Sequence, residues 1–225
     1  MKNFILYYIK YILILFDFNF FLQKDIKDQY LFFKKNKKQN FKNIIDIGAN
    51  VGLWSIAFKT VFSKANFYLI EPNSNHNKFL RYISRNIYNY VLFSKKGMVN
   101  FYYTEHFNGT GNSIYKENSK IPFRKYKVKS TTLDYLLYRK FKNENIDLIK
   151  IDTQGSELDI LKGSKKILRN TKNIIIEISE TNYNYKKDLK SKIFKFLQQS
   201  KFKQIKKISV SGYGKTKHSD YLFTK

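Results

Sequence analysis

The sequence predicts an α/β fold: a doubly wound, mostly parallel seven-stranded sheet with helices on both faces, ending in an antiparallel hairpin. From Lys42 onward, short apolar runs alternate with stretches of helical periodicity, which is typical of strands joined by helical crossovers. The last two strand-like runs flank the turn Ser211–Gly214, and so short a connection makes them antiparallel. With 225 residues, we predict one domain over 42–225, preceded by an N-terminal apolar helix and basic linker over 1–41.

The strands of this sheet are predicted from runs of β-branched and aromatic residues. In chain order they are Asn43–Gly48, Asn66–Glu71, Tyr90–Ser94, Ile146–Asp152, Asn173–Ser179, Gln204–Val210 and Tyr221–Thr224. Helical periodicity lies between them, over Leu53–Ser63, Asn75–Asn86, Thr131–Phe141, Ser156–Leu168 and Lys186–Ser200. Three intervening segments complete the pattern: an extra strand at Met98–Glu105, a loop rich in Asn, Gly and Ser at Phe107–Ser119, and an extended run at Lys127–Ser130.

The first residues are the least ordinary part of the chain. Phe4–Leu22 is almost wholly apolar but contains Lys10 and Asp17, whereas a span of the bilayer takes about 20 residues with few charges. The first alanine is Ala49, so no small-residue cleavage site follows the run and a secretory signal is disfavoured. Three alternatives remain: a helix packed on the core, an interfacial membrane helix, and a true anchor. The expected location is cytoplasmic, with peripheral contact at the inner face of the membrane if the lysines of Lys34–Lys42 attract anionic lipid.

The net charge of +26 has two interpretations. One is attraction to phosphate-rich partners, either nucleic acid or anionic membrane. The other is composition, because Lys, Asn, Ile, Phe and Tyr are abundant together, as in proteins encoded by AT-rich genomes. The lysines are dispersed and there is no arginine-rich tract, so nucleic acid is the disfavoured partner.

Cysteine and histidine usage excludes several kinds of site. The chain has no cysteine, which excludes disulfides, thiolate metal sites and cysteine nucleophiles. Its three histidines, His76, His106 and His218, are scattered and none has metal-ligand spacing with an acid. We therefore assign no metal site.

The most informative stretch is a strand that ends in an acid and enters a helix through glycines. Gly48 and Gly52 flank Asn50, which stands where a dinucleotide-binding turn has its second glycine. That glycine admits a pyrophosphate, so its absence favours a cofactor without one, such as S-adenosylmethionine. Asp46 before the turn would face the cofactor's ammonium or a bound water, and Glu71, at the end of the next strand, its ribose hydroxyls.

A second motif follows the predicted strand Ile146–Asp152. The strand delivers Asp152 to the carboxyl edge of the sheet, Gly155 turns the chain, and Glu157 lies in the first helical turn, where the helix dipole favours an acid. Ligands of open α/β sheets bind outside the carboxyl ends of the strands. We therefore expect Asp152 to converge with the two earlier strand-end acids on one crevice.

In these motifs the sequence resembles the FkbM-type methyltransferases. The similarity lies in Asp46–Gly52, in the strand end Phe67–Asn73 and, most specifically, in Lys150–Gly163, all in the family's order. Ser130–Asp134 matches the stretch that opens the helix before the fourth strand. The resemblance extends from about Lys42 to about Glu180, and the C-terminal hairpin is compatible with it.

The resemblance implies O-methylation with S-adenosylmethionine as donor, often on sugars of surface polysaccharides or on secondary metabolites. The residues that it places at the cofactor are Asp46, Gly48, Ala49, Asn50, Gly52, Glu71, Pro72 and Asn73, with Ser94 beside the adenine. Asp152 and Glu157 are expected near the reaction centre, and His106, in the loop expected to cover the substrate, is a third candidate base. Gln154 departs from the family, which often has an acid there, so a carboxylate at that position is not required.

Two rival functions remain open at this point. The charge suggests an RNA 2′-O-methyltransferase, whereas cytosine-C5 chemistry would need a cysteine and amino-methylating enzymes usually have a proline-rich tetrad, absent here because Pro72 and Pro122 are isolated. The other rival is a basic binding module of the same fold that has lost turnover, which the intact strand-end acids disfavour. We expect a small-molecule or glycan acceptor.

Overall fold

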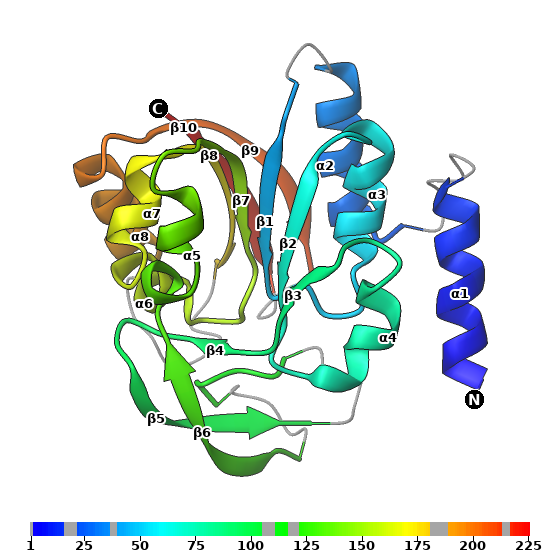
Figure 1. Cartoon of the computed structure of the whole chain (residues 1–225), viewed down its shortest axis with the longest axis horizontal. Helices are drawn as coiled ribbons and strands as arrows, with labels where there is room; N and C mark the ends of the chain where they lie inside the picture. The colour runs from blue at the N-terminus through cyan, green and yellow to red at the C-terminus, as the bar shows by residue number, and fades with distance from the viewer. Residues whose placement is uncertain are drawn as a thin grey trace.

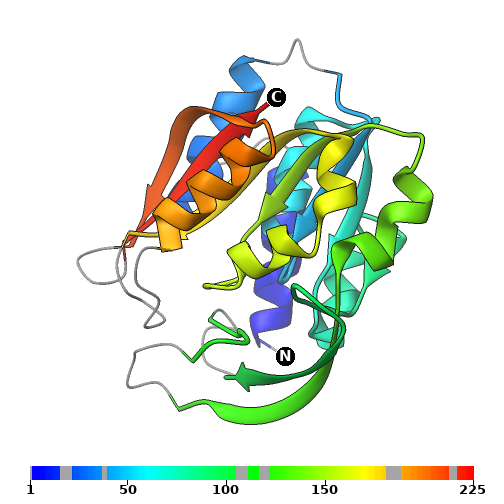
Figure 2. The same ribbon diagram turned by 90° about the vertical axis from the view of Figure 1, so that its left-hand side faces the viewer.

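The computed structural model describes residues 2–15, 22–36, 40–104, 111–116, 122–180, 189–212 and 217–225. Within them, a central seven-stranded sheet lies between two layers of helices, and a smaller three-stranded sheet lies beside one end of it (Figures 1 and 2). The central order is β3-β2-β1-β7-β8-β10-β9. The predicted fold class is therefore confirmed.

Five neighbouring strands of the central sheet are joined by parallel pairing, and the last two strands are joined to the sheet by antiparallel pairing. The parallel strands are β1 (Asn43–Ile47), β2 (Asn66–Ile70), β3 (Asn86–Tyr88), β7 (Ile146–Ile151) and β8 (Thr171–Ser179). The last two are β9 (Lys203–Ser211) and β10 (His218–Thr224). β10 is inserted between β8 and β9 and runs antiparallel to both, as the short connection between the last two strands requires.

Side chains of the central strands alternate between two cores. In β1, Ile45 and Ile47 face one cluster of buried residues, whereas Ile44 faces the other. Helices α1 (Lys2–Leu15), α2 (Lys24–Lys35), α3 (Leu53–Val61) and α4 (Asn77–Leu80) belong to the side of Ile44. Helices α5 (Leu133–Phe141), α6 (Glu157–Lys162), α7 (Lys165–Arg169) and α8 (Leu189–Gln199) cover the other side (Figure 1). All five residues of β1 are buried, as expected of a central parallel strand.

The third parallel strand was predicted in the wrong place. The helix expected over Asn75–Asn86 is reduced to one 3-10 turn and α4, which ends at Leu80, and the chain re-enters the sheet as β3. Ser84 assists the turn, because its Oγ donates to Phe67 O at 2.6 Å and accepts from Asn86 N at 3.0 Å. The expected strand at Tyr90–Ser94 contributes only β4 (Val91–Leu92), which pairs with β6 (Arg124–Thr131) in the smaller sheet beside β5 (Gly97–Tyr103).

The helix predicted over Ser156–Leu168 is broken into α6 and α7 at Gly163. A Cβ at Gly163 would come 2.3 Å from Phe93 O, so the break lets this backbone approach the chain after β4. Most of the loop predicted over Phe107–Ser119 lies outside the described residues; in its described part, Ser113 bridges Tyr102 of β5.

The stretch expected as a basic linker contains the helix α2. Its Gln29 accepts a hydrogen bond from Trp54 Nε1 at 2.8 Å and donates one to Ser209 Oγ at 3.3 Å, while Tyr30 and Phe33 are buried beneath it. The lysines around this segment obscure the helical periodicity of its apolar residues, so no helix was predicted here. A domain boundary near residue 41 stays a prediction.

Helix α1 packs on the same face. Tyr11 and Ile14 are buried, the rings of Tyr7 and Phe79 lie 5.4 Å apart, and the Tyr11 hydroxyl donates a hydrogen bond to Val51 O. The expectation of a helix packed on the core is thus confirmed for one face of α1. Among the described helices, none is both long and apolar enough to cross a membrane.

Candidate active site

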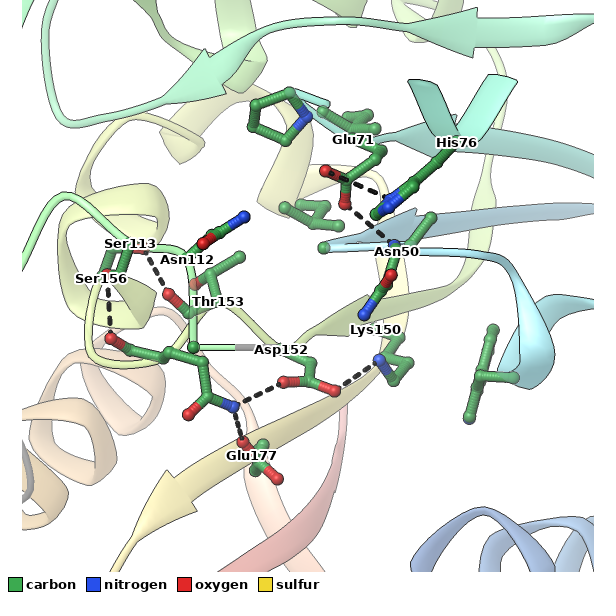
Figure 3. A pocket seen from close by; sticks show the side chains of 18 of the residues that line it. Asn50, Glu71, His76, Asn112, Ser113, Lys150, Asp152, Thr153, Ser156 and Glu177 are labelled. Carbon is green, nitrogen blue, oxygen red and sulfur yellow. Dashed lines mark hydrogen bonds and ion pairs between the residues drawn. The ribbon is translucent and has the colours of Figure 1, made fainter. Parts of the chain in front are cut away.

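A cavity of about 410 Å³ opens at the carboxyl ends of the parallel strands, where the strand-end acids were expected to converge. Its walls come from the turns after β1, β2 and β7 and from segments distant in sequence. Those distant residues include Tyr7 of α1, Gln23 and Asp25 at the start of α2, Trp54 of α3, Asn112, and His218 of β10. Figure 3 shows the polar side chains around it.

The glycine turn is built around backbone contacts with the neighbouring strands. Gly48 has φ +82°, and its N–H and that of Ala49 donate to Ile70 O at 3.0 and 3.2 Å. A Cβ at Gly48 would lie 1.8 Å from Asp152 O, so only glycine fits between β1 and the end of β7. Gly52, also in the left-handed region, is the N-cap of α3 and, contrary to the prediction, does not line the cavity, whereas Ala49 and Asn50 do.

Glu71, at the end of the neighbouring strand β2, is hydrogen-bonded to this turn. Its Oε2 accepts from Asn50 N at 2.8 Å (Figure 3), and its Oε1 accepts from Asn73 N at 2.9 Å. Burial disfavours the charged form of both groups. It therefore raises the pKa of Glu71 to about 7 and lowers the pKa of the adjacent His76 to about 4. Pro72 also lines the cavity, whereas the Asn73 side chain turns to accept from Asn75 N.

Asp46 differs from expectation. Its carboxylate is completely buried beneath the turn, accepts from Ser55 Oγ at 2.7 Å, and is not among the cavity-lining residues. Its Oδ1 lies 3.7 Å from the ammonium of Lys150, which is paired with Asp152 Oδ2 at 2.9 Å. Asp46 therefore supports the site through Lys150.

The Lys150 ammonium fixes the charge of this part of the cavity. Burial alone would lower its pKa, but Asp152 and Asp46 outweigh burial and raise it, so the lysine stays charged. Burial alone would raise the pKa of Asp152, but Lys150 holds it below its ordinary value. Asp152 lines the cavity, as expected, as a stable carboxylate.

Glu177 and His218 complete the polar wall and were missed from the sequence. Gln154 Nε2 donates to Glu177 Oε2 at 2.8 Å and to Asp152 Oδ1 at 3.3 Å (Figure 3). His218 Nδ1 lies 3.7 Å from the same Glu177 oxygen. Burial, followed by Asp152 and Asp220, raises the pKa of Glu177 well above its ordinary value. The sequence feature that could have identified Glu177 is its position as a single acid within an apolar predicted strand.

Of three other candidate residues, two do not line the cavity and one lies outside the described residues. Glu157 is buried and accepts from Gly155 N at 2.8 Å and from Thr153 N and Oγ1 at 3.3 Å, so it holds the loop after β7 together. Ser94 is not a cavity-lining residue; Tyr90, Val91 and Leu92 form that wall. His106 lies outside the described residues.

These residues fit S-adenosylmethionine. The volume lies in the range of small-molecule sites, about 300–1,000 Å³. Glu71 offers carboxylate oxygens to two hydroxyls, and Ile70, Val91 and Leu92 offer an apolar wall for a purine. With this strand order, the site defines the class of Rossmann-like, S-adenosylmethionine-dependent methyltransferases.

The model of the methyltransferase FkbM domain family matches residues 46–204. Because this is most of the chain, the protein belongs to the FkbM methyltransferase family, and S-adenosylmethionine is its methyl donor. No curated protein matches the sequence.

Solved structures similar to this chain are distant in sequence. An uncharacterized protein from Listeria monocytogenes serotype 4b matches with a TM-score of 0.52 and 14% identity, over 90% of this chain and 67% of that chain, which supports the fold. A methyltransferase from Clostridium acetobutylicum matches with 0.49 and 12% identity, over 92% and 94%. Magnesium protoporphyrin IX methyltransferase from Synechocystis, solved with bound S-adenosylmethionine, matches with 0.49 and 9% identity, over 91% and 84%.

Glu71 should make donor binding dependent on pH. Hydroxyl donors favour the ionised carboxylate, so S-adenosylhomocysteine should bind less tightly as the pH falls below the Glu71 pKa of about 7, approaching about tenfold per pH unit. Isothermal titration from about pH 8 to about pH 6 measures this.

Glu71→Gln is the matched variant, because it keeps the shape and removes the titration. It should bind S-adenosylhomocysteine more weakly at high pH, by about 1.5–3 kcal/mol for a lost charge-assisted hydrogen bond, and show little pH dependence. Wild-type affinity in a folded Glu71→Gln protein would exclude the ribose contact.

Proposed function

We propose that this protein transfers a methyl group to a hydroxyl of an uncharged or cationic glycan-type acceptor, such as a sugar of a surface polysaccharide or a secondary metabolite. The observation that carries the proposal is the charge of the cavity. Its described lining has four carboxylates, those of Asp25, Glu71, Asp152 and Glu177, with Lys150 as the single lysine and no arginine. The whole chain has 43 lysines and arginines. In the part of the chain that the structure describes, the cavity lining is therefore poor in basic residues.

This charge distribution disfavours the RNA alternative. A 2′-hydroxyl reaches a site together with its flanking phosphates, which need basic partners. The one cavity lysine is already paired with Asp152 and lies near Asp46. Burial, followed by the charge of Asp152, raises the pKa of Asp25, which also lines the cavity.

The described lining of the cavity suits a sugar. Besides the cofactor residues, it includes the rings of Tyr7 and Trp54 and the polar groups of Gln23, Asp25 and Asn112. Pockets of this kind use apolar rings for contact area and a few polar groups for orientation. Amides and carboxylates together satisfy sugar hydroxyls, which donate and accept hydrogen bonds.

The residues act mainly by alignment. The donor, when bound, supplies the electrophilic methyl and the leaving group. Glu71 and the Asn50 turn hold one side of the cavity, and Asp152, fixed by Lys150, orients the acceptor hydroxyl. Such alignment supplies about 7–11 kcal/mol of barrier reduction. Because its pKa is held low, Asp152 is suited to orienting the acceptor and poorly suited to keeping its proton.

The test is methyl transfer from labelled S-adenosylmethionine to a panel of neutral glycans, amino sugars and structured RNA. We expect label on a hydroxyl of a sugar and stoichiometric S-adenosylhomocysteine. Label on RNA ribose alone would establish the rival enzyme. Donor binding without turnover on any acceptor would favour the inactive module.

A separate observation favours contact with anionic membrane. Leu6, Ile9 and Ile12 are 51%, 47% and 48% exposed, on the side of α1 opposite Tyr11 and Ile14. Helix α1 is the outermost helix on its side of the molecule (Figure 1). Its 14 residues extend about 21 Å, less than the roughly 30 Å of a hydrocarbon core. We propose that α1 lies in the membrane interface, with the net charge of +26 adding attraction to anionic lipid.

The full chain should sediment with vesicles containing phosphatidylserine at low salt and be released at high salt, because each nearby basic residue contributes about 1 kcal/mol and salt screens it. Substituting Leu6, Ile9 and Ile12 together by Asn should weaken binding by at least about tenfold. Leu31→Asn, on α2 and 44% exposed, is the matched control and should bind as wild type. Equal sedimentation of both variants would contradict the proposal.

Substitution is preferable to deletion of the N-terminal segment. The Tyr11 hydroxyl donates to Val51 O within the cofactor turn, and α2 contributes Asp25 to the cavity. Removing residues 1–24 would therefore disturb the donor site as well as the exposed face.

A further inference from the structure

Methyl transfer to a hydroxyl must dispose of a proton, and most polar groups of the cavity are committed elsewhere. Glu71 accepts from two backbone N–H groups. Asp152 is paired with Lys150, which keeps its own proton because its pKa is raised by Asp152 and Asp46 against burial. His76 lies beside Glu71, on the cofactor side. Besides Asp25 of α2, the remaining carboxyl and imidazole groups of the described lining are those of Glu177 and His218.

These two residues are brought together by the antiparallel insertion of β10. His218, its first residue, is opposite Ser179 of β8, and Asp220 is opposite Glu177, so the imidazole and the carboxylate share one face of the sheet. His218 Nδ1 lies 3.7 Å from Glu177 Oε2, and both side chains line the cavity. Their side chains are 12% and 10% exposed, so the pair is shielded from bulk water but open to the cavity.

The pair is also tied to the acceptor side. Gln154 Nε2 donates to Glu177 and to Asp152, which lines the same cavity (Figure 3). The Gln154 backbone has φ 55°, in the left-handed region, which directs this amide between two carboxyl groups. Gln154 thereby holds the His218 pair and the orienting carboxylate of Asp152 in one assembly.

We propose that His218 is the general base of methyl transfer and that Glu177 is its positioning residue. This rests on the proposed function, because a hydroxyl acceptor must lose its proton to become an ether oxygen. The acceptor oxygen forms a bond to the methyl carbon, the carbon–sulfur bond breaks with its electron pair left on sulfur, and the O–H proton passes to the imidazole. The resulting imidazolium then returns its proton to water.

The surrounding charges favour that imidazolium. Glu177 of β8 contacts the imidazole at 3.7 Å, and the charged groups coupled to Glu177 and its neighbour Asp220 of β10 are Lys150 of β7, Asp152 directly after β7, and Asp25 of α2. Burial, followed by the neighbouring acids, raises the pKa of Glu177 well above its ordinary value and that of Asp220 to about 7. Imidazole suits the role because its ordinary pKa lies near neutrality.

The decisive experiment is single-turnover methyl transfer by His218→Gln on an acceptor found with the glycan panel. We expect the rate to fall by about 10²–10⁴-fold, S-adenosylhomocysteine affinity to change by less than about threefold, and the rise of rate with pH to disappear. Added imidazole should restore part of the rate. Glu177→Gln should reduce the rate less and move the limb of the pH profile to lower pH, because the imidazolium loses its carboxylate.

His76→Gln is the matched control. It removes the other described histidine of the cavity and is expected to change donor affinity while keeping the pH limb. Wild-type turnover and pH profile in folded His218→Gln would overturn the proposal and leave the proposed function standing. The same loss of the pH limb in His76→Gln would overturn it as well.

A second measurement is independent of any acceptor. With labelled histidine and bound S-adenosylhomocysteine, NMR titration of the His218 imidazole should show a lower pKa in Glu177→Gln than in wild type. If the panel contains no substrate, this titration still decides whether the pair exists. An unchanged His218 titration in Glu177→Gln would overturn the pair.

Discussion

Gly48→Ala is expected to abolish donor binding and to lower the free energy of unfolding by at least about 3 kcal/mol. The added Cβ would lie 1.8 Å from the carbonyl oxygen of Asp152, and φ at this position is +82°. The strained backbone alone costs about 1–3 kcal/mol, and relief of the clash must separate β1 from the end of β7. Urea unfolding measures the stability, and titration with S-adenosylhomocysteine measures the site.

Gly97→Ala is the matched control for this prediction. Gly97 also has positive φ, but no atom lies within 4 Å of an added Cβ. Its substitution should therefore carry only the conformational cost and leave donor affinity unchanged. A Gly48→Ala protein with the stability and affinity of Gly97→Ala would show that the turn does not depend on the close approach.

Asp152→Asn is expected to reduce turnover by at least about 10²-fold with donor affinity largely retained, because the amide keeps the shape but loses the charge that orients the acceptor. It should also destabilise the fold. Lys150 would lose its partner at 2.9 Å and keep Asp46 at 3.7 Å, and breaking a buried pair costs about 3–5 kcal/mol.

Lys150→Met combined with Asp152→Asn separates the two effects. The double variant removes both charges of the pair but leaves the buried Asp46 without a cation, so it should be less stable than Asp152→Asn and equally inactive, as a double-mutant cycle by urea unfolding and methyl transfer would measure. Because Lys150 holds the pKa of Asp152 low, the ion pair stabilises the folded protein at pH values above the ordinary aspartate pKa. This stabilisation is lost as the pH falls through the lower pKa that Asp152 has in the folded state. Wild-type turnover in folded Asp152→Asn would remove Asp152 from the site.

Local patterns in the sequence determined the fold class and the cofactor side of the cavity. The alternation of strands and helices, and the short final connection, define the sheet and its antiparallel end. Gly48, Glu71 and Asp152 were predicted together because parallel strands end at one edge of a sheet, which makes their positions readable from spacing alone.

The tertiary structure decided the rest, because it depends on contacts between segments far apart in the chain. Asp46 is a strand-end acid like Asp152, yet the packing of α3 turns it toward Ser55 and buries it. Glu157 looked like a catalytic acid, but it accepts hydrogen bonds from its own loop. No local pattern distinguishes a carboxylate that faces a cavity from one that satisfies backbone N–H groups.

The acceptor side shows the same limit most clearly. Asp25, Glu177 and His218 come from α2, β8 and β10, and no sequence spacing relates them. They meet because β10 enters the sheet beside β8 in a fixed register and because Gln29 and Trp54 fasten α2 over the same face. Side chains brought together by strand register and helix docking are joined only after folding, when burial also shifts their pKa values and gives them their chemistry.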